Sequence, residues 1–104
     1  MLLGQVVGTV VSTQKTESLT GLKLLLVQNL DITGKPAKGY HVAADSVQAG
    51  LGDVVIYSTG SAARQTEITT ERPVDAVVMG IVDTWDVNGK PAFNKSEPLE
   101  VADV

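Results

Sequence analysis

The sequence predicts an all-β fold, a small closed or partly closed barrel of about five to six strands with at most one short helical turn. Short runs rich in valine and leucine alternate with turns that contain glycine and proline. Glycines also lie inside several of these runs, where they permit the bends that a small barrel requires. Apolar residues make up 43% of the chain and aromatic residues only 4%, so valine and leucine must fill the core.

The first two strands are expected over residues 2–13 and 22–30, joined by a polar turn at residues 15–21. The first run is rich in β-branched residues, and Gly4 and Gly8 inside it indicate bends or a close approach of another strand. The second run is almost entirely apolar. Its short length and its flanking turns favour a strand that is buried on both faces over a helix.

Two further strands are expected over residues 40–44 and 54–58. A turn at residues 31–36 precedes the first of them, because its glycine can adopt a positive φ and its proline cannot donate a ladder hydrogen bond. A glycine-containing turn at residues 50–53 separates the two strands. This arrangement predicts a hairpin loop followed by a short connection between strands.

The chain then contains one candidate helical turn and a last buried strand. Ser61 is placed to cap a turn through residues 62–64, and residues 65–72 are expected to form a loop. Residues 74–83 predict a strand covered on both faces, which a turn at residues 86–91 closes. Counted together, these segments predict a barrel that is OB-like in size.

Two turn sequences repeat each other in the second quarter and the last quarter of the chain. DITGKPA at residues 31–37 and DVNGKPA at residues 86–92 share five of seven residues, but the strands around them do not match. Similar turn chemistry therefore explains them better than an internal duplication. The acidic, weakly patterned residues 94–104 predict a loose tail or an edge strand, after a single barrel domain over residues 1–93.

Charge and composition exclude several classes of function. Twelve acidic and eight basic residues give a net charge of -4, which repels the phosphate backbone of nucleic acids. The absence of cysteine excludes disulfides and thiolate zinc sites and suits a reducing cytoplasm. No basic segment precedes the first apolar residues, and no apolar run approaches the length of about 20 residues that spans a membrane.

Catalytic and metal-binding groups are sparse, so we expect no catalytic residues, no metal site and no cofactor. His41 is the only histidine and is expected to be an ordinary strand residue on a polar or interface face. The candidate carboxylates lie at strand ends or turns, where they commonly accept hydrogen bonds from backbone amides; they are Asp31, Asp45, Asp53, Asp75, Asp83 and Asp86.

The segment Gly60–Arg64, with the sequence GSAAR, allows two interpretations. Its backbone amides and one guanidinium could meet an anion, although the segment lacks the Gly-Lys-Ser/Thr element of a P-loop. Alternatively, it is a tight loop in which Arg64 forms an ion pair across a subunit boundary. The residues by themselves leave both interpretations open.

Several blocks of sequence, in this order, resemble the EutN/CcmL family of bacterial microcompartment vertex proteins over residues 3–86. They are GQVVGTVVSTQK at residues 4–15, LTGLKLLLVQNLD at 19–31, VAADSVQAGLGD at 42–53, GSAAR at 60–64, and RPVDA at 72–76 running into GIVD at 80–83. One departure is Gln48, where the family pattern usually has glycine. Glutamine resists the backbone angle that glycine permits, so the local turn is expected to differ.

This resemblance implies a pentamer of β-barrels, shaped like a truncated pyramid, at the corners of a polyhedral shell in the bacterial cytoplasm. Hexameric and pseudohexameric shell proteins would be its partners, with no nucleic acid and no membrane involved. By analogy with the family, Gly60, Ser61 and Ala62 are expected near a narrow opening on the symmetry axis. The candidate interface residues are Arg64 with Asp75, and Arg72 with a carboxylate of the next subunit.

Two other functions remain open from the sequence. A monomeric OB-like module would bind a peptide, an oligosaccharide or a nucleic acid in a groove of the barrel. An enzyme would use carboxylates near Gly60–Arg64 and would need a concave pocket within one subunit. The mass of the native particle separates a ring of five chains from both alternatives.

Overall fold

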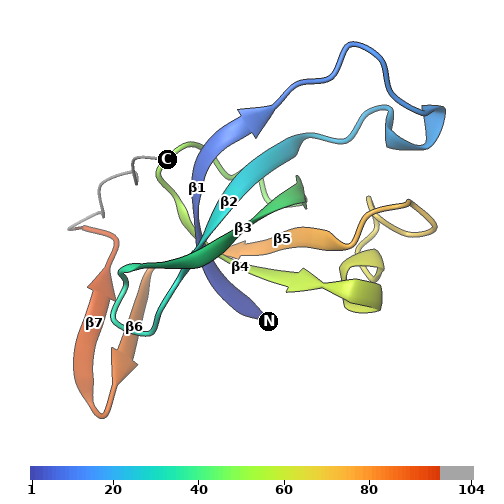
Figure 1. Ribbon diagram of the computed structural model, residues 1–104. Coiled ribbons are helices and arrows are strands. Elements are labelled where there is room, and N and C mark those ends of the chain that lie inside the picture. The colour runs from blue at the N-terminus through green and yellow to red at the C-terminus, as the bar shows by residue number, and fades with distance from the viewer. Residues whose placement is uncertain (97–104) are drawn as a thin grey trace.

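The computed structural model describes residues 1–96 as a closed five-stranded barrel with a two-stranded hairpin at one end (Figure 1). The all-β prediction is confirmed. In chain order the elements are β1 (Leu2–Val10), the 3-10 turn η1 (Glu17–Leu19), β2 (Leu24–Leu30), β3 (Pro36–Asp45), β4 (Val54–Thr59), the 3-10 turn η2 (Gly60–Arg64), β5 (Ala76–Ile81), β6 (Thr84–Val87) and β7 (Lys90–Asn94).

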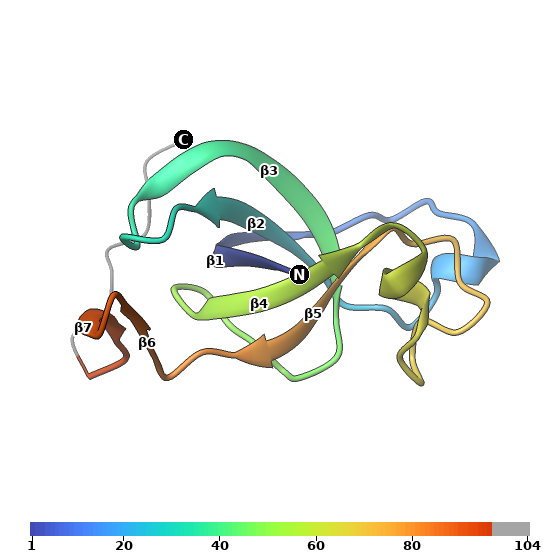
Figure 2. The ribbon, with the colours of Figure 1, turned by 90° about the horizontal axis from the view of Figure 1, so that it is seen from below.

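The barrel closes in the strand order β1-β2-β3-β5-β4, with β4 returning to β1. Figure 2 shows these five strands surrounding the interior. Every neighbouring pair is antiparallel except β3 and β5, which run parallel through the two pairs Ala44↔Val77 and Asp45↔Val78. A register shift between Val6 and Gly8 bends β1 across β2, as expected for a glycine inside a strand of a small barrel.

The barrel interior is filled almost entirely by aliphatic side chains. Gly4 explains how the strands pack so closely, because a Cβ atom there would overlap Val27 Cγ1 and lie 3.0 Å from a ring carbon of Tyr57. Only glycine permits this approach. The buried cluster consists of Val6, Leu25, Val27, Ala43, Ala49, Val55, Tyr57, Ala76 and Val78.

β2 and β5, the two strands predicted to be covered on both faces, differ in how far their outer faces are buried. In β5 the successive residues Ala76, Val77 and Val78 are all buried, because Val77 packs outward onto a second cluster that contains Ala63 and Val74. In β2 the inward residues Leu25 and Val27 are fully buried, but the outward leucines at 24 and 26 are only partly buried. The other described residues therefore do not fully cover the outer face of β2.

Some element boundaries differ from the prediction. The third strand begins at Pro36 and not at residue 40, since a proline can occupy the first position of a strand. The strand expected at residues 74–83 begins at Ala76, because residues 72–75 bond elsewhere: the Val74 amide donates to Arg72 O and Asp75 O accepts from Gly60 N. A second 3-10 turn, η1, lies in the expected polar turn.

The hairpin β6–β7 was not predicted. Trp85 and Phe93 face each other across it, with ring centroids 4.9 Å apart, and Trp85 Nε1 donates to Ile32 O at 2.8 Å. Phe93 is buried with Leu30 and Val54 of the barrel. The hairpin therefore packs against the barrel beside the β2–β3 turn, as Figure 1 shows at the lower left.

The repeated turn sequences use glycine at positive φ, as predicted, but in two different geometries. In the first turn the Asp31 carboxylate accepts from the Thr33 amide at 2.8 Å and from the Lys35 amide at 3.1 Å, with Gly34 at φ 85°. In the second, Asn88 at φ 52° and Gly89 at φ 75° form a two-residue turn between β6 and β7.

The start of the predicted tail overlaps the last strand. Asn94 still belongs to β7, and only Lys95 and Ser96 of the remaining segment are described. The rest of the predicted tail, residues 97–104, lies outside the described residues.

Candidate assembly face and axial segment

Two long loops, residues 11–23 and 60–75, extend from the end of the barrel opposite the hairpin (Figure 1). All six residues singled out by the sequence as axial or interface candidates lie in the second loop. The structure thus groups these residues at one end of the molecule. A backbone hydrogen bond joins Gly60 to Asp75, and among residues 1–96 no ion pair joins any of the six.

The axial candidates Gly60, Ser61 and Ala62 open the 3-10 turn η2 and are exposed. Gly60 has a φ of 65°, its amide donates to Asp75 O at 2.8 Å, and a Cβ atom there would meet nothing within 4 Å. Ala63 is completely buried and anchors the turn. The segment is therefore a fixed turn that presents small side chains outward.

The interface candidates Arg64 and Asp75 do not pair with each other within the chain. Arg64 Nη1 donates to Val74 O at 3.3 Å, which places the guanidinium one residue from Asp75. The Asp75 side chain is exposed, and its carboxylate has no hydrogen bond or ion pair among residues 1–96. The Asp75 carboxylate and the Arg64 guanidinium thus lie near each other at the surface without pairing.

Arg72 has a role that the sequence did not predict. Its Nη1 donates to Ser18 O at 2.9 Å and to Thr20 O at 3.0 Å, so it ties the second loop to the first. These acceptors are more than 50 residues away in the sequence and are backbone atoms. No residue-type pattern could have indicated them.

A band of apolar side chains follows the outer faces of β1, β2 and β3 beside these loops. In the ladders Val10 faces Leu24, and Leu26 faces Val42. Val42 is 49% exposed and Val11, just past β1, is 86% exposed. We refer to this band as the outer apolar face and define it as Val10, Val11, Leu22, Leu24, Leu26 and Val42.

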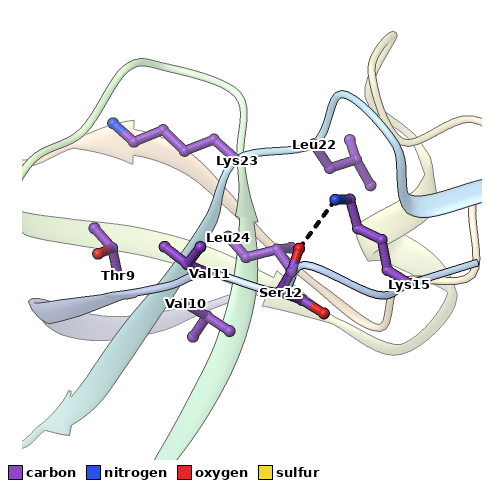
Figure 3. Close-up of a pocket in the computed structure, with 8 residues that line it drawn as sticks. All are labelled: Thr9, Val10, Val11, Ser12, Lys15, Leu22, Lys23 and Leu24. Atoms are coloured by element: carbon purple, nitrogen blue, oxygen red, sulfur yellow. Dashed lines mark hydrogen bonds between the residues drawn. The ribbon is translucent and has the colours of Figure 1, made fainter.

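Two hollows adjoin the outer apolar face. One, of about 200 Å³, is lined by Leu19, Leu24, Val42, Ala44, Pro73, Val74 and Asp75. The other, of about 390 Å³, lies between the end of β1 and the start of β2 (Figure 3). There Lys15 Nζ donates to Ser12 O at 3.1 Å, whereas Lys23 extends away and pairs with Asp45 at 3.7 Å. Leu24 lines both hollows, so the face is continuous between them.

His41 is a half-buried residue of β3 whose ring faces Tyr57, with the two ring centroids 5.2 Å apart. Tyr57 is fully buried, its hydroxyl donates to Asn29 Oδ1, and the same oxygen lies 3.0 Å from His41 Nδ1. Burial raises the pKa of the Tyr57 hydroxyl. The histidine thus completes the hydrogen bonding of a buried tyrosine, which is a structural role.

The turn that contains Gln48 holds this residue at a backbone angle that glutamine disfavours. Gln48 adopts the left-handed conformation with a φ of 61°, the region that favours glycine. The Asp45 carboxylate holds this turn by accepting from the amides of Val47 and Ala49 at 3.1 and 3.3 Å. The surrounding hydrogen bonds therefore impose the glycine-like angle on glutamine.

Among residues 1–96, no three His, Cys, Asp or Glu side chains are grouped so that they could hold a metal ion. In the same part of the chain, no helix has the length and apolar character to cross a membrane.

The fold and the surface define a small closed β-barrel with one apolar outer face and two loops gathered at one end. The chain belongs to the EutN/CcmL family, because residues 1–83 match the family model described as ethanolamine utilisation protein EutN/carboxysome.

Named relatives agree with this assignment. The chain is 52% identical over 97 residues to the carboxysome shell vertex protein CcmL of Gloeobacter violaceus, which covers 93% of this chain and 97% of that protein. The solved structure of Gloeobacter violaceus CcmL superposes with a TM-score of 0.89 over 93% of this chain and all of that one, at 52% identity. GrpN, a pentameric microcompartment shell protein from Rhodospirillum rubrum, has a TM-score of 0.77 at 49% identity, over 84% of this chain and 99% of that chain.

Proposed function

We propose that this chain is a structural shell subunit that forms pentamers and caps the vertices of a polyhedral microcompartment in the bacterial cytoplasm. The relatives named as shell vertex proteins, and the pentameric shell protein GrpN among the similar structures, support this proposal. In this role the chain performs no catalysis, and hexameric and pseudohexameric shell proteins are its partners. A sheet of hexagonal tiles needs pentagonal corners in order to close.

The outer apolar face is the observation that carries the proposal. Burying a valine or leucine side chain completely stabilises a protein by about 1.5–3 kcal/mol, and here six such side chains stay partly or largely in contact with solvent. A neighbouring subunit on this face would remove them from water. If this face contacts a different surface of the next chain, the contact repeats head to tail and can close into a ring.

The axial and interface candidates of the second loop, residues 60–75, can be placed in the same ring of subunits. We propose that Gly60, Ser61 and Ala62 line the axial opening, where small side chains let several backbones converge. Arg64 and Asp75 would then pair between neighbouring subunits, and Arg72 would contact a carboxylate of the next subunit with the donors that its bonds to the first loop leave over. The barrel domain, residues 1–93, would carry this assembly, and the tail, residues 94–104, would not be needed for it.

The test compares two charge insertions at exposed apolar residues. Val42→Glu places a carboxylate on the outer apolar face, and we expect it to dissociate the ring into single chains, because a buried unpaired charge is strongly unfavourable. Leu51→Glu is the matched control, since Leu51 is 68% exposed in the β3–β4 connection and lies off this face. Native mass spectrometry should find pentamers for the wild-type chain and the control. A wild-type chain that stays single at micromolar concentration would refute the proposal.

The proposed ion pair has its own test. Arg64→Ala or Asp75→Ala should weaken the pentamer, and the charge exchange Arg64→Asp with Asp75→Arg should restore part of the loss. Light scattering measures the mass of the particle in each variant. Unchanged stoichiometry in both single variants would exclude these two residues from the interface.

A further inference from the structure

The turn between β6 and β7 contains the one Asn-Gly pair of the sequence, Asn88-Gly89, and both residues are exposed (Figure 1). The backbone nitrogen of the residue that follows an asparagine can attack its side chain, and glycine obstructs this attack least because it has no Cβ atom. A Cβ atom at Gly89 would meet nothing within 4 Å, so the turn is open to water. The other two asparagines, Asn29 and Asn94, are followed by leucine and lysine, whose side chains hinder the attack.

The attack converts the asparagine side chain into a carboxyl group without oxidation or reduction. Gly89 N forms a bond to Asn88 Cγ, the bond between Cγ and Nδ2 breaks, and Nδ2 leaves as ammonia with the proton that the Gly89 nitrogen loses. Water then opens the cyclic imide that has formed. Cleavage between Gly89 N and Asn88 Cγ gives aspartate, whereas cleavage between Gly89 N and the backbone carbonyl carbon of Asn88 gives isoaspartate.

The geometry of the folded turn opposes this ring closure. Asn88 has a φ of 52° and Gly89 a φ of 75°, and the ladder pair Val87↔Lys90 closes the turn around them. Two positive φ angles define a type I′ turn, in which ψ of the first central residue is about +30°. Ring closure requires Gly89 N to swing round to Cγ by rotation about the bond between Cα and C of Asn88, and the ladder pair resists this rotation. The attack therefore requires the hairpin to open.

The hairpin stays closed through its packing on the barrel. β6 and β7 have only four and five residues, and a two-stranded hairpin is at best marginally stable alone in water. Trp85 Nε1 donates to Ile32 O, and the centroids of the Trp85 and Phe93 rings lie 4.9 Å apart. Phe93 is only 6% exposed. These two aromatic residues therefore control how often Asn88 is released from the geometry of the turn.

We propose that Asn88 is a site of spontaneous deamidation, with water as the only co-reactant, and that docking of the hairpin on the barrel limits its rate. The aspartate product places a second carboxylate close to Asp86. The isoaspartate product adds one carbon atom to the backbone, which a two-residue turn cannot hold while it keeps the Val87↔Lys90 pair. This product therefore loosens the hairpin and withdraws Trp85 from the β2–β3 turn. Every group in the reaction belongs to one chain, so the proposal does not depend on the ring proposed above.

Peptide mapping by mass spectrometry tests the site after the folded protein has been kept at mildly alkaline pH. Asn94 is the internal control, because it is exposed in the same hairpin but precedes a lysine. We expect Asn88 to deamidate at least tenfold faster than Asn94. In the denatured chain, where the turn geometry plays no part, Gly89→Ala should slow the reaction at Asn88 at least tenfold. Comparable conversion of the two asparagines, or an unchanged rate in Gly89→Ala, would overturn the assignment.

Two comparisons test whether docking of the hairpin limits the rate. The denatured wild-type chain should deamidate at Asn88 several-fold faster than the folded one, and Trp85→Ala should raise the folded rate toward the denatured one. Tyr40→Ala is the matched control and should leave the rate unchanged, since Tyr40 is a half-exposed aromatic residue of β3, outside the hairpin. Equal rates in the folded and denatured wild-type chains would refute the limit set by docking, whether or not Trp85→Ala folds.

The fluorescence of Trp85, the single tryptophan, reports on the hairpin after modification. An isoaspartyl methyltransferase, which methylates the isoaspartate carboxyl group, measures how much of this product each sample contains. Chains that carry isoaspartate should emit at longer wavelength than unmodified chains, because the indole ring moves into water. Unshifted emission from the isoaspartate chains would contradict the loosening of the hairpin.

Discussion

Gln48 shows how a single residue can be held in a conformation that its side chain disfavours. Its φ of 61° lies in the left-handed region, and the Asp45 carboxylate fixes the amides on either side of it. The cost of this angle falls on the folded state, because an unfolded glutamine avoids it. Position 48 therefore offers a way to stabilise the barrel.

Gln48→Gly is expected to raise the free energy of unfolding by up to about 1 kcal/mol, since relief of the backbone strain exceeds the extra entropy of glycine in the unfolded chain. Gln48→Val should lower it, because a β-branched residue tolerates this φ less well. Chemical denaturation of the three proteins measures both differences. A less stable glycine variant would show that Gln48 is not strained.

The Asp31 carboxylate makes the stability of the turn between β2 and β3 depend on pH. Hydrogen bonds from the Thr33 hydroxyl and the Lys35 amide hold the pKa of this carboxyl below its ordinary value. A carboxyl with a lowered folded pKa stabilises the protein above its unfolded pKa, and the contribution is lost as the pH falls through the folded pKa.

Comparison of the wild-type protein with Asp31→Asn tests this effect. The stability advantage of the wild-type protein should be complete at neutral pH and should shrink once the pH falls below about 4. Thermal unfolding followed across this range measures the difference. An advantage that does not change with pH would show that the Asp31 carboxylate is not what stabilises the turn.

Arg72 connects the two long loops, residues 11–23 and 60–75, which lie far apart in the sequence. Its two bonds, to Ser18 O and Thr20 O, hold the segment around η1 against the loop after η2. Arg72→Gln should release the first loop, because glutamine is too short to reach both carbonyls. Trypsin should then cut after Lys15 or Lys23 several-fold faster than in the wild-type protein. Arg64→Gln is the control, because among residues 1–96 the Arg64 guanidinium donates only to Val74 O, which belongs to its own loop, residues 60–75.

The hairpin β6–β7 could be predicted only in part from the local sequence. Its Asn-Gly turn is a recognisable hairpin signal, but its strands have only four and five residues. Their stability depends on Trp85 donating to Ile32 O and on Phe93 packing against Leu30 and Val54, and these contacts join distant parts of the chain. The barrel strands were predictable because each one carries its own apolar pattern.

The candidate site also combines features that local sequence predicts with features that depend on contacts between distant segments. A helical turn in this segment was predicted, but it begins at Gly60 and is preceded by Thr59, so Ser61 lies inside the turn and does not cap it. The bonds of Arg64 and Arg72 to backbone carbonyls were not predicted, since a carbonyl acceptor leaves no trace in the sequence. The position of His41 against Tyr57 was also missed, because the burial of a strand face depends on the closed barrel.

The outer apolar face leads to a prediction about the thermal stability of the whole molecule. If neighbouring subunits cover it, folding and assembly are linked, and the midpoint of thermal unfolding should rise with protein concentration. Val42→Glu should remove this dependence, whereas Leu51→Glu should keep it. Calorimetry over a hundredfold range of concentration measures the shift. A midpoint that is constant for the wild-type protein would show that the single chain is stable without neighbours.

The parallel pairing of β3 with β5 bears on how the barrel forms. Only two residue pairs join these strands, and all of β4 and η2 lies between them in the chain, whereas β1, β2 and β3 pair through successive hairpins. Contacts between distant segments carry a larger loop-closure cost, so we expect this seam to be completed last and to open first. Amide hydrogens along the seam should then exchange with solvent sooner than those between β1 and β2, and a shell built from such barrels would meet its earliest structural failure at this edge.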